Sequence, residues 1–363
     1  MENWIADEAR VQPAVVVDQT DICFDSGFYT AFPHVVRLED SELLLAFRQA
    51  PREEAVRHTH MRSIITVVRS YDSGHTWELP SATQLAAGGG QEFAPLYLGD
   101  GRTVGALAWH HVVPRAESRR SGIPHPNQHE YPYATPGTYW AESGNYGLTW
   151  PPHQVRLLGA ASMPSAAPIL LADGRILCPA YSWQPGTDVM NAVAFLSPDK
   201  GDTWTQPVVM AQGSRSVGRF CEPAVIETEP GVLLALHRVE AGPKEMAGCF
   251  RANRSTDGGF TWSEPLNTGI ASGACPRLLR LRDGRLVLTY GRRSEPYGIR
   301  ARLSTDGGRT WGDHALLLRP GRNWDLGYTS SVQLDDGNIL TVTYMQNEQG
   351  VTGIVGTFWR VPD

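Results

Sequence analysis

One eight-residue motif, Ser-x-Asp-x-Gly-x-Thr-Trp, recurs along this chain and limits its fold more than any other feature. In a tight hairpin, Asp or Asn caps backbone N–H groups, Gly adopts a positive φ, and Trp anchors the turn on the sheet. One match would be weak, but repeated matches indicate a repeated hairpin. Complete copies occupy residues 70–77, 197–204, 255–262 and 304–311, and a weaker copy with Asn145 in the Asp place occupies residues 143–150.

A second repeat alternates with the first. It consists of an apolar strand, a short turn and another apolar strand, and the near-continuous apolar runs are typical of strands buried on both faces. Each of the first five hairpins is followed by the Asp-containing turn. The six predicted hairpins occupy residues 32–48, 93–107, 167–177, 222–238, 276–290 and 331–342.

Two hairpins make a four-stranded unit, so six units predict an all-β fold, a six-bladed β-propeller of four-stranded antiparallel blades. The sixth unit ends with a third strand at residues 353–359, and we expect residues 14–17 to supply its fourth strand and close the ring. A β-solenoid or a pair of sandwiches would not explain six equal hairpin pairs. The prediction is a single domain, residues 1–363, with an inserted loop at residues 110–139.

Composition excludes several classes of partner. The net charge of −6 argues against nucleic-acid binding. No apolar run of about 20 residues predicts a membrane span, and no signal sequence is visible, so a cytoplasmic location is expected. The pattern does not specify an oligomeric state. Five cysteines without a Cys-x-x-Cys pair predict buried free thiols rather than disulfides or a zinc site, and no metal or other cofactor is expected.

In an antiparallel blade, the start of the first strand and the end of the second lie at the same end. Residues at these points should therefore gather at one mouth of the central axis, where a binding site is expected. Arg pairs with carboxylates and aromatic rings stack on sugars, so the set predicts an anionic sugar; alternatively, an arginine here only balances a neighbouring acid. The set comprises Phe32, His34, Arg48, Glu92, His110, His111, Ser165, Tyr181, Trp183, Glu222, Arg238, Arg277, Arg292, Arg293, Asp325, Tyr328, Tyr344 and Gln346.

The Asp-containing boxes resemble those of the sialidase (neuraminidase) superfamily, over residues 28–359. That resemblance implies a Tyr nucleophile activated by a Glu, three arginines on a substrate carboxylate and an Asp general acid. Glu222, followed by Arg238, resembles the Glu and the second Arg, and Tyr328 resembles the nucleophile. For the third arginine the sequence leaves three candidates open: Arg292, Arg293 and Arg300.

Two positions depart from the family pattern. Ala31 stands where the first arginine is expected, and Arg37 or Arg48 is an alternative source of that charge. The segment expected to carry the acid Asp, residues 57–63, contains none. His58 or His60 is therefore the predicted acid, because imidazole titrates near neutrality, and Glu53 and Glu54 lie in the same loop.

The inserted loop at residues 110–139 is rich in His, Tyr and Pro. Connections longer than about 15 residues are usually functional or disordered, and this composition favours an ordered lid over the mouth. The His spacing matches no metal-site template, so stacking or hydrogen bonding is the expected role of the histidines.

Three functions remain open from the sequence. The first is an exo-acting glycoside hydrolase on an acidic sugar. The second is a lyase on uronic-acid linkages, in which Arg neutralises the carboxylate and Tyr or His removes a proton. The third is a propeller that binds a glycan without turnover. An unsaturated, ultraviolet-absorbing product would distinguish the lyase from the hydrolase. Affinity for a glycan without turnover would identify the binding protein.

Overall fold

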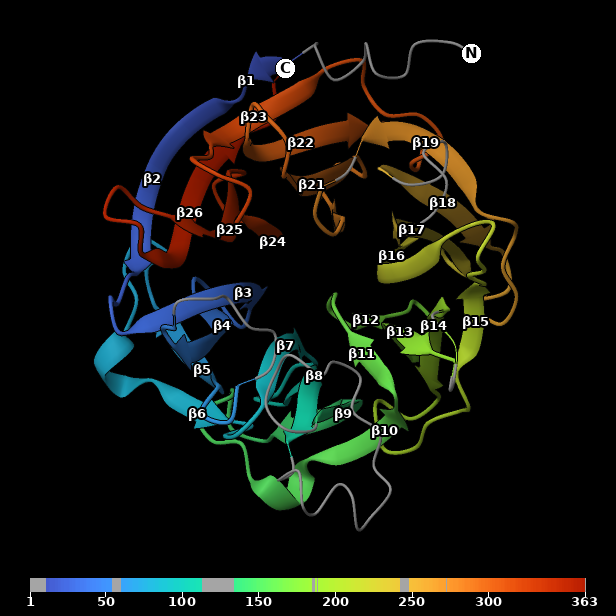
Figure 1. Ribbon diagram of the computed structural model, residues 1–363, viewed down its shortest axis with the longest axis horizontal. Helices are drawn as coiled ribbons and strands as arrows, with labels where there is room; N and C mark the ends of the chain where they lie inside the picture. The colour runs from blue at the N-terminus through green and yellow to red at the C-terminus, as the bar shows by residue number, and fades with distance from the viewer. Residues whose placement is uncertain are drawn as a thin grey trace.

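The computed structural model describes residues 11–53, 60–112, 134–184, 187, 189–241, 248–271 and 273–362. Six β-sheets surround a central axis like the blades of a propeller, as Figure 1 shows. The sequence-based prediction of an all-β, six-bladed propeller is therefore confirmed. Among the described residues, no helix is long and apolar enough to cross a membrane.

The first three blades follow one another along the chain, each with its strands in order from the axis outward. Blade 1 contains β3 (Phe28–Arg37), β4 (Leu43–Pro51), β5 (Ile64–Ser70) and β6 (Thr83–Leu85). Blade 2 contains β7 (Gly90–Tyr97), β8 (Thr103–Val112), β9 (Ala134–Ser143) and β10 (Arg156–Ala160). In blade 3 the inner strand is split into β11 (Ser162–Pro164) and β12 (Ile169–Leu170), before β13 (Ile176–Trp183), β14 (Met190–Ser197) and β15 (Val208–Ala211).

The last three blades repeat the pattern. Blade 4 contains β16 (Arg219–Glu229), β17 (Val232–Glu240), β18 (Cys249–Ser255) and β19 (Leu266–Ala271). Blade 5 contains β20 (Arg277–Arg280), β21 (Leu286–Arg292), β22 (Gly298–Ser304) and β23 (Ala315–Pro320). Blade 6 contains β24 (Gly327–Gln333), β25 (Ile339–Gln346), β26 (Thr352–Arg360) and, as its outer strand, β2 (Val15–Cys23).

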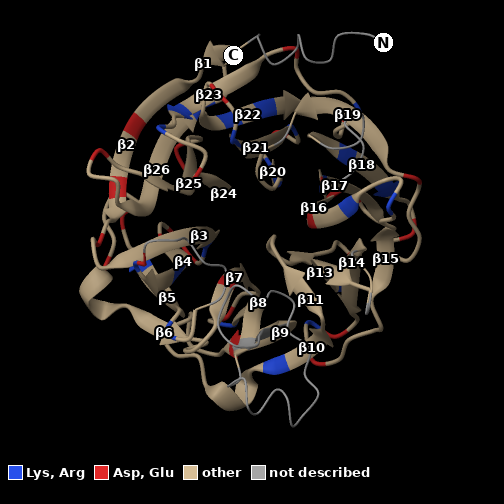
Figure 2. Cartoon of the chain, viewed as in Figure 1, with Lys and Arg blue, Asp and Glu red and all other residues tan. Residues whose placement is uncertain are grey.

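The N-terminal segment closes the ring, as predicted. β2 pairs antiparallel with β26, so the two ends of the described chain share one blade. The short strand β1 (Val11–Pro13) was not anticipated: it adds to the outer edge of blade 5 in parallel with β23. Figure 2 shows acidic and basic residues dispersed around the ring.

The apolar runs form the packing between blades. On β4, residues 43–47 are at most 1% exposed, because neighbouring blades cover both faces of the sheet. One cluster joins Leu44 and Ala46 of blade 1 to Phe93 and Leu107 of blade 2. The five cysteines are all buried and free.

Each Asp-containing turn is held by its own side chains. In blade 4, Asp257 Oδ1 accepts hydrogen bonds from the Ser255 hydroxyl at 2.7 Å and the Thr261 N–H at 2.9 Å. Its Oδ2 accepts the Thr261 hydroxyl at 2.6 Å, and Trp262 Nε1 donates to the Gly259 carbonyl at 3.0 Å. In blade 2, Asn145 makes equivalent contacts, which explains why the weaker copy still forms the turn.

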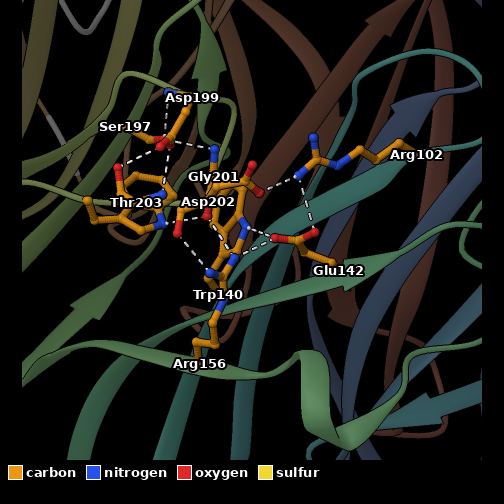
Figure 3. Close-up of polar contacts among 10 residues, drawn as sticks. Arg102, Trp140, Glu142, Arg156, Ser197, Asp199, Gly201, Asp202 and Thr203 are labelled. Carbon is orange, nitrogen blue, oxygen red and sulfur yellow. Dashed lines mark hydrogen bonds and ion pairs between the residues drawn. The ribbon is translucent and has the colours of Figure 1, made fainter.

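The same turns dock onto the preceding blade. Figure 3 shows the blade 3 turn against blade 2: Arg156 donates to the Gly201 carbonyl at 2.7 Å and to the Asp202 carbonyl at 2.9 Å. Arg102 pairs with the Asp202 carboxylate at 3.3 Å, and Glu142 lies between the two arginines. The blade 2 side chain Trp140 meets Trp204 of the turn edge-on, with ring centroids 4.7 Å apart.

The docking repeats around the ring. In blade 5, the Gly307 carbonyl accepts a hydrogen bond from Arg254 of blade 4 at 2.7 Å. A Cβ on Gly308 would lie 2.3 Å from Leu234 of blade 4. In blade 1, a Cβ on Gly74 would lie 2.4 Å from Leu340 of blade 6, and His75 stacks on Phe358 of the same blade with ring centroids 4.4 Å apart.

Replacing Gly308 by Ala should destabilise the protein much more than replacing Gly307 by Ala. Both residues have a positive φ, but a Cβ on Gly307 would meet nothing nearer than 3.8 Å. We expect Gly307→Ala to cost about 1 kcal/mol of unfolding free energy, and Gly308→Ala about 1–3 kcal/mol more. Urea unfolding measures both; equal losses would show that contact with the preceding blade is unimportant.

The box aspartates should make stability fall in acid. Partial burial tends to raise the pKa of Asp257, but hydrogen bonds from Thr261, Ser255 and Phe260 outweigh it and lower the pKa to about 2. A lowered folded-state pKa adds stability above the unfolded value of about 3.9, and this is lost as the pH falls towards 2. Asp257→Asn, which copies the natural Asn145, should therefore flatten the decline of the urea midpoint between pH 5 and 2. A decline as steep as that of the wild type would contradict the role of Asp257.

Candidate active site

Three innermost strands carry a residue in the left-handed region of backbone space. These are Phe32 on β3 (φ 57°), Glu222 on β16 (φ 48°) and Tyr328 on β24 (φ 52°). Each sits at a break in the register of its strand with the next one. A non-Gly residue held there costs of order 1–3 kcal/mol, and such strain clusters at functional sites.

Tyr328 and Glu222 form the centre of the site. The Tyr328 hydroxyl donates a hydrogen bond to Glu222 Oε1, and Arg238 Nη1 donates to Glu222 Oε2 at 2.7 Å. Burial tends to raise the pKa of Glu222, but the charge and hydrogen bond of Arg238 and the hydrogen bond from Tyr328 together lower it. Burial, and then the charge of Glu222, raise the pKa of Tyr328 well above its usual value. A carboxylate thus faces a neutral phenol.

Two guanidinium groups lie against the Tyr328 ring. Arg293 Cζ is 5.4 Å from the ring centroid, and Arg277 Cζ is 5.7 Å from it. Arg293 is held by the Leu326 carbonyl at 2.9 Å and by the Tyr344 hydroxyl at 2.6 Å. Of the three candidates for the third arginine, Arg293 is thus the one beside Tyr328.

Behind Arg277 lies a buried polar chain. Arg277 Nη2 donates to Glu92 Oε1 at 3.0 Å, and His34 Nε2 is 2.5 Å from the same oxygen. Burial raises the pKa of Glu92 well above its usual range, although Arg277 opposes this. Burial, followed by the charge of Arg277, lowers the pKa of His34 well below its usual range. Both pKa shifts favour the neutral forms of these two side chains.

Other predicted residues border this centre. Tyr181 and Trp183 on β13 pack together with ring centroids 5.1 Å apart, and both are partly exposed. Burial, and then the charge of Glu222, raise the pKa of Tyr181. Asp325, just before β24, accepts hydrogen bonds from the hydroxyls of Tyr29 at 2.9 Å and Thr352 at 3.3 Å.

The loop between β4 and β5 contains a His–Glu pair. His60 Nδ1 accepts the Arg62 N–H at 3.0 Å, so Nε2 carries the proton and donates to Glu53 Oε1 at 2.9 Å. The His60 side chain is 3% exposed and that of Glu53 is 32% exposed. Glu53 is thus the member that solvent reaches. His58 and Glu54 lie outside the described residues, as does most of the predicted lid (residues 113–133).

Several predicted residues lie apart from the Tyr328–Glu222 pair. Arg292, the last residue of β21, donates hydrogen bonds to the Ser294 and Glu295 carbonyls just beyond the strand. Arg300 is buried on the third strand of blade 5, opposite Tyr290. Arg48, by contrast, is buried on β4 directly opposite Ala31, and its positive charge acts on Tyr29 at the border of the site.

β8 carries two of the predicted histidines, His110 and His111. His110 is 8% exposed, and its backbone N–H donates to the Gly89 carbonyl at 3.0 Å. His111 is the next residue of the same strand. Within the described ranges, no three His, Cys, Asp or Glu side chains gather in a way that would hold a metal ion.

Sequence reasoning missed two contributors. Glu240 accepts a second ion pair from Arg238 at 2.7 Å, and Tyr29 connects Asp325 to the cluster of aromatic rings. The signal for Glu240 was present, because it follows Arg238 by two residues on one strand and so faces the same side. Tyr29 had no comparable signal.

Comparison with known proteins identifies relatives of this fold. Residues 123–341 match the family described as BNR repeat-like domain. A sialidase from Bacteroides fragilis is 27% identical over 301 residues, which cover 75% of this chain and 52% of that protein, so the chain spans about half the length of this curated relative.

Two solved structures extend the comparison. A protein of unknown function from Dyadobacter fermentans has a TM-score of 0.81 and 27% identity, covering 97% of this chain and all of that one. The Trypanosoma rangeli sialidase in complex with sialic acid has a TM-score of 0.65 and 14% identity, covering 96% of this chain and 60% of that one. The similarity to the Trypanosoma rangeli sialidase is a similarity of fold.

Proposed function

This chain belongs to the BNR repeat-like domain family, and we propose that it is a sialidase-like, exo-acting glycoside hydrolase that cleaves an acidic sugar. The observation that carries the proposal is the hydrogen bond from Tyr328 to Glu222 within a cluster of arginines near the propeller axis. The similarity to a bacterial sialidase supports the same reaction class.

In this proposal Tyr328 is the nucleophile and Glu222 its base. A neutral phenol approaches a carbon beside an anionic carboxylate without the repulsion that a carboxylate nucleophile would meet; sialidases with a Tyr nucleophile are a known exception among glycosidases. Glu222 takes the phenolic proton, and its lowered pKa keeps it ionised near neutral pH.

The substrate carboxylate would lie against Arg238 and Arg293. Both side chains are partly exposed, whereas Arg277 is buried behind the Tyr328 ring. Arg238 is held by Glu222 and Glu240, and Arg293 by Leu326 and Tyr344, so both guanidinium groups are oriented before substrate binds. Tyr181 and Trp183 would offer aromatic surface to the sugar.

Glu53 would be the general acid, oriented by the hydrogen bond from His60. In this role the exposed carboxyl of the pair, rather than the buried imidazole, would protonate the leaving group. The proposal retains the sequence-based expectation that the loop between β4 and β5 supplies the acid.

Tyr328→Phe and Glu222→Gln should each lower kcat at least about 100-fold on α-sialosides or uronosides that release a fluorescent alcohol. The matched controls are Tyr71→Phe, on an exposed turn, and Glu229→Gln, at the far end of β16; both should hydrolyse like the wild type. An unsaturated, ultraviolet-absorbing product would instead identify a lyase. Binding of the glycan without turnover by the wild type would identify a non-catalytic propeller.

Glu53→Gln should slow hydrolysis of glycosides with poor leaving groups by about 100-fold or more, but should change little for activated aryl glycosides, whose departure needs no proton. His60→Gln should show the same dependence on the leaving group more weakly. The measurement is kcat/KM across aryl glycosides whose leaving groups differ in pKa. Equal losses with every leaving group would exclude this residue pair as the acid.

A further inference from the structure

Arg277 is placed differently from the two arginines proposed to bind substrate. It is 6% exposed, its Nη1 donates to the Pro276 carbonyl at 3.1 Å, and its Nη2 donates to Glu92 at 3.0 Å. Turning towards a substrate carboxylate would break both hydrogen bonds. Its guanidinium group instead lies 5.7 Å from the centre of the Tyr328 ring, within the range of cation–π attraction.

The support of Arg277 comes from two other blades. Glu92, on β7 of blade 2, contacts both Arg277 of blade 5 and His34 of blade 1 through one oxygen atom. Removing charged groups from water is costly, so a buried arrangement of this kind calls for a role beyond stability. The pKa shifts of Glu92 and His34 both favour neutral forms, so Glu92 offsets the positive charge of Arg277 beside Tyr328 less than a fully ionised carboxylate would.

Tyr328 needs such a charge. Its burial and the neighbouring Glu222 both disfavour the phenolate, yet the hydroxyl must lose its proton in order to attack carbon. Arg293 supplies one positive charge, but its Nη2 and Nε are committed to Tyr344 and Leu326, and it also faces the proposed substrate. Arg277 supplies a second charge that no substrate group would neutralise.

We infer that Arg277, held in place by Glu92 and His34, is a positioning residue that stabilises negative charge on Tyr328 while the phenolic proton passes to Glu222. The inference rests on the proposed function. In the step concerned, the Tyr328 oxygen forms a bond to the anomeric carbon as the glycosidic C–O bond breaks. Glu222 keeps the phenolic proton, and the leaving oxygen takes a proton from the general acid.

Several charged or titratable groups bear on the Tyr328 hydroxyl, and the experiment must separate Arg277 from them. The carboxylate of Glu222 opposes ionisation of the phenol, and the cations favour it. Among the described residues, these groups include Glu222 on β16, Arg238 on β17, Cys275 before β20, Arg277 on β20, Arg293 after β21 and Tyr344 on β25.

The first arm of the test is kinetic. Arg277→Met removes the charge but keeps an unbranched side chain; Arg280→Met, at the exposed end of the same strand, is the matched control. We expect Arg277→Met to lower kcat by about 10–100-fold with KM changed less than about threefold, and Arg277→Lys to recover much of the loss. A rise in KM with kcat unchanged would make Arg277 a substrate ligand and overturn the inference.

The second arm measures the pKa of the Tyr328 phenol directly. With 3-fluorotyrosine at position 328, ¹⁹F NMR should report a phenol pKa that is about one unit or more higher in Arg277→Met than in the parent or Arg280→Met. A more acidic difluorotyrosine at position 328 should restore much of the kcat lost in Arg277→Met, which it could not do if Arg277 were only structural.

The two arms separate failure of the inference from failure of the proposed function. An unchanged phenol pKa, or no rescue in a protein that hydrolyses glycosides, overturns the role of Arg277 while leaving the hydrolase intact. If no glycoside is hydrolysed by the wild type, the proposed function fails, and the ¹⁹F titration still decides whether Arg277 acts on Tyr328. Circular dichroism of Arg277→Met and Arg277→Lys confirms that the variants fold.

Discussion

Docking of each Asp-containing turn onto the preceding blade is the contact on which the architecture depends. Within its turn, the Asp257 side chain accepts hydrogen bonds from the turn backbone. The turn also brings a glycine and a tryptophan against the neighbouring sheet. Arginines on the preceding blade then bind the carbonyls that the turn exposes, as Arg254 does at Gly307. Because each of the five turns joins consecutive blades, local turn chemistry is carried around the ring, and β2 completes the sixth blade, which has no such turn.

The closed ring brings distant chain segments to one axis. Tyr328 of blade 6 meets Glu222 of blade 4, and Glu92 of blade 2 meets Arg277 of blade 5, although 106 and 185 residues separate the two pairs. Strained backbone at Glu222 and Tyr328, and buried charge at Arg277, are costs that the surrounding apolar packing between blades offsets. Rigid inner strands suit a site whose reacting groups must be oriented before substrate arrives.

The sequence predicted many of the residues that form the site, but not how they are arranged around one another. The position of Glu222 and Tyr328 at the start of inner strands indicated where they would lie, and the structure joins them by a hydrogen bond. The choice of Arg293 over Arg292 and Arg300 could not be made from sequence, because adjacent residues on a strand face opposite sides and the register was unknown. Likewise, Arg277 was expected among the substrate ligands, and only its two hydrogen bonds and its burial indicate a different role.

The sequence by itself determined the fold class, the number of blades, the turn chemistry and the closure by an N-terminal strand, because these follow from short-range patterns repeated at regular intervals. The tertiary structure alone decided the left-handed backbone at Phe32, Glu222 and Tyr328, the Glu92–His34 support of Arg277 and the pairing of Glu53 with His60. The physical reason is the distance along the chain over which each interaction acts. Turn and strand preferences act between neighbours along the chain, whereas side-chain charge, burial and hydrogen bonding act between whichever residues the closed ring brings together.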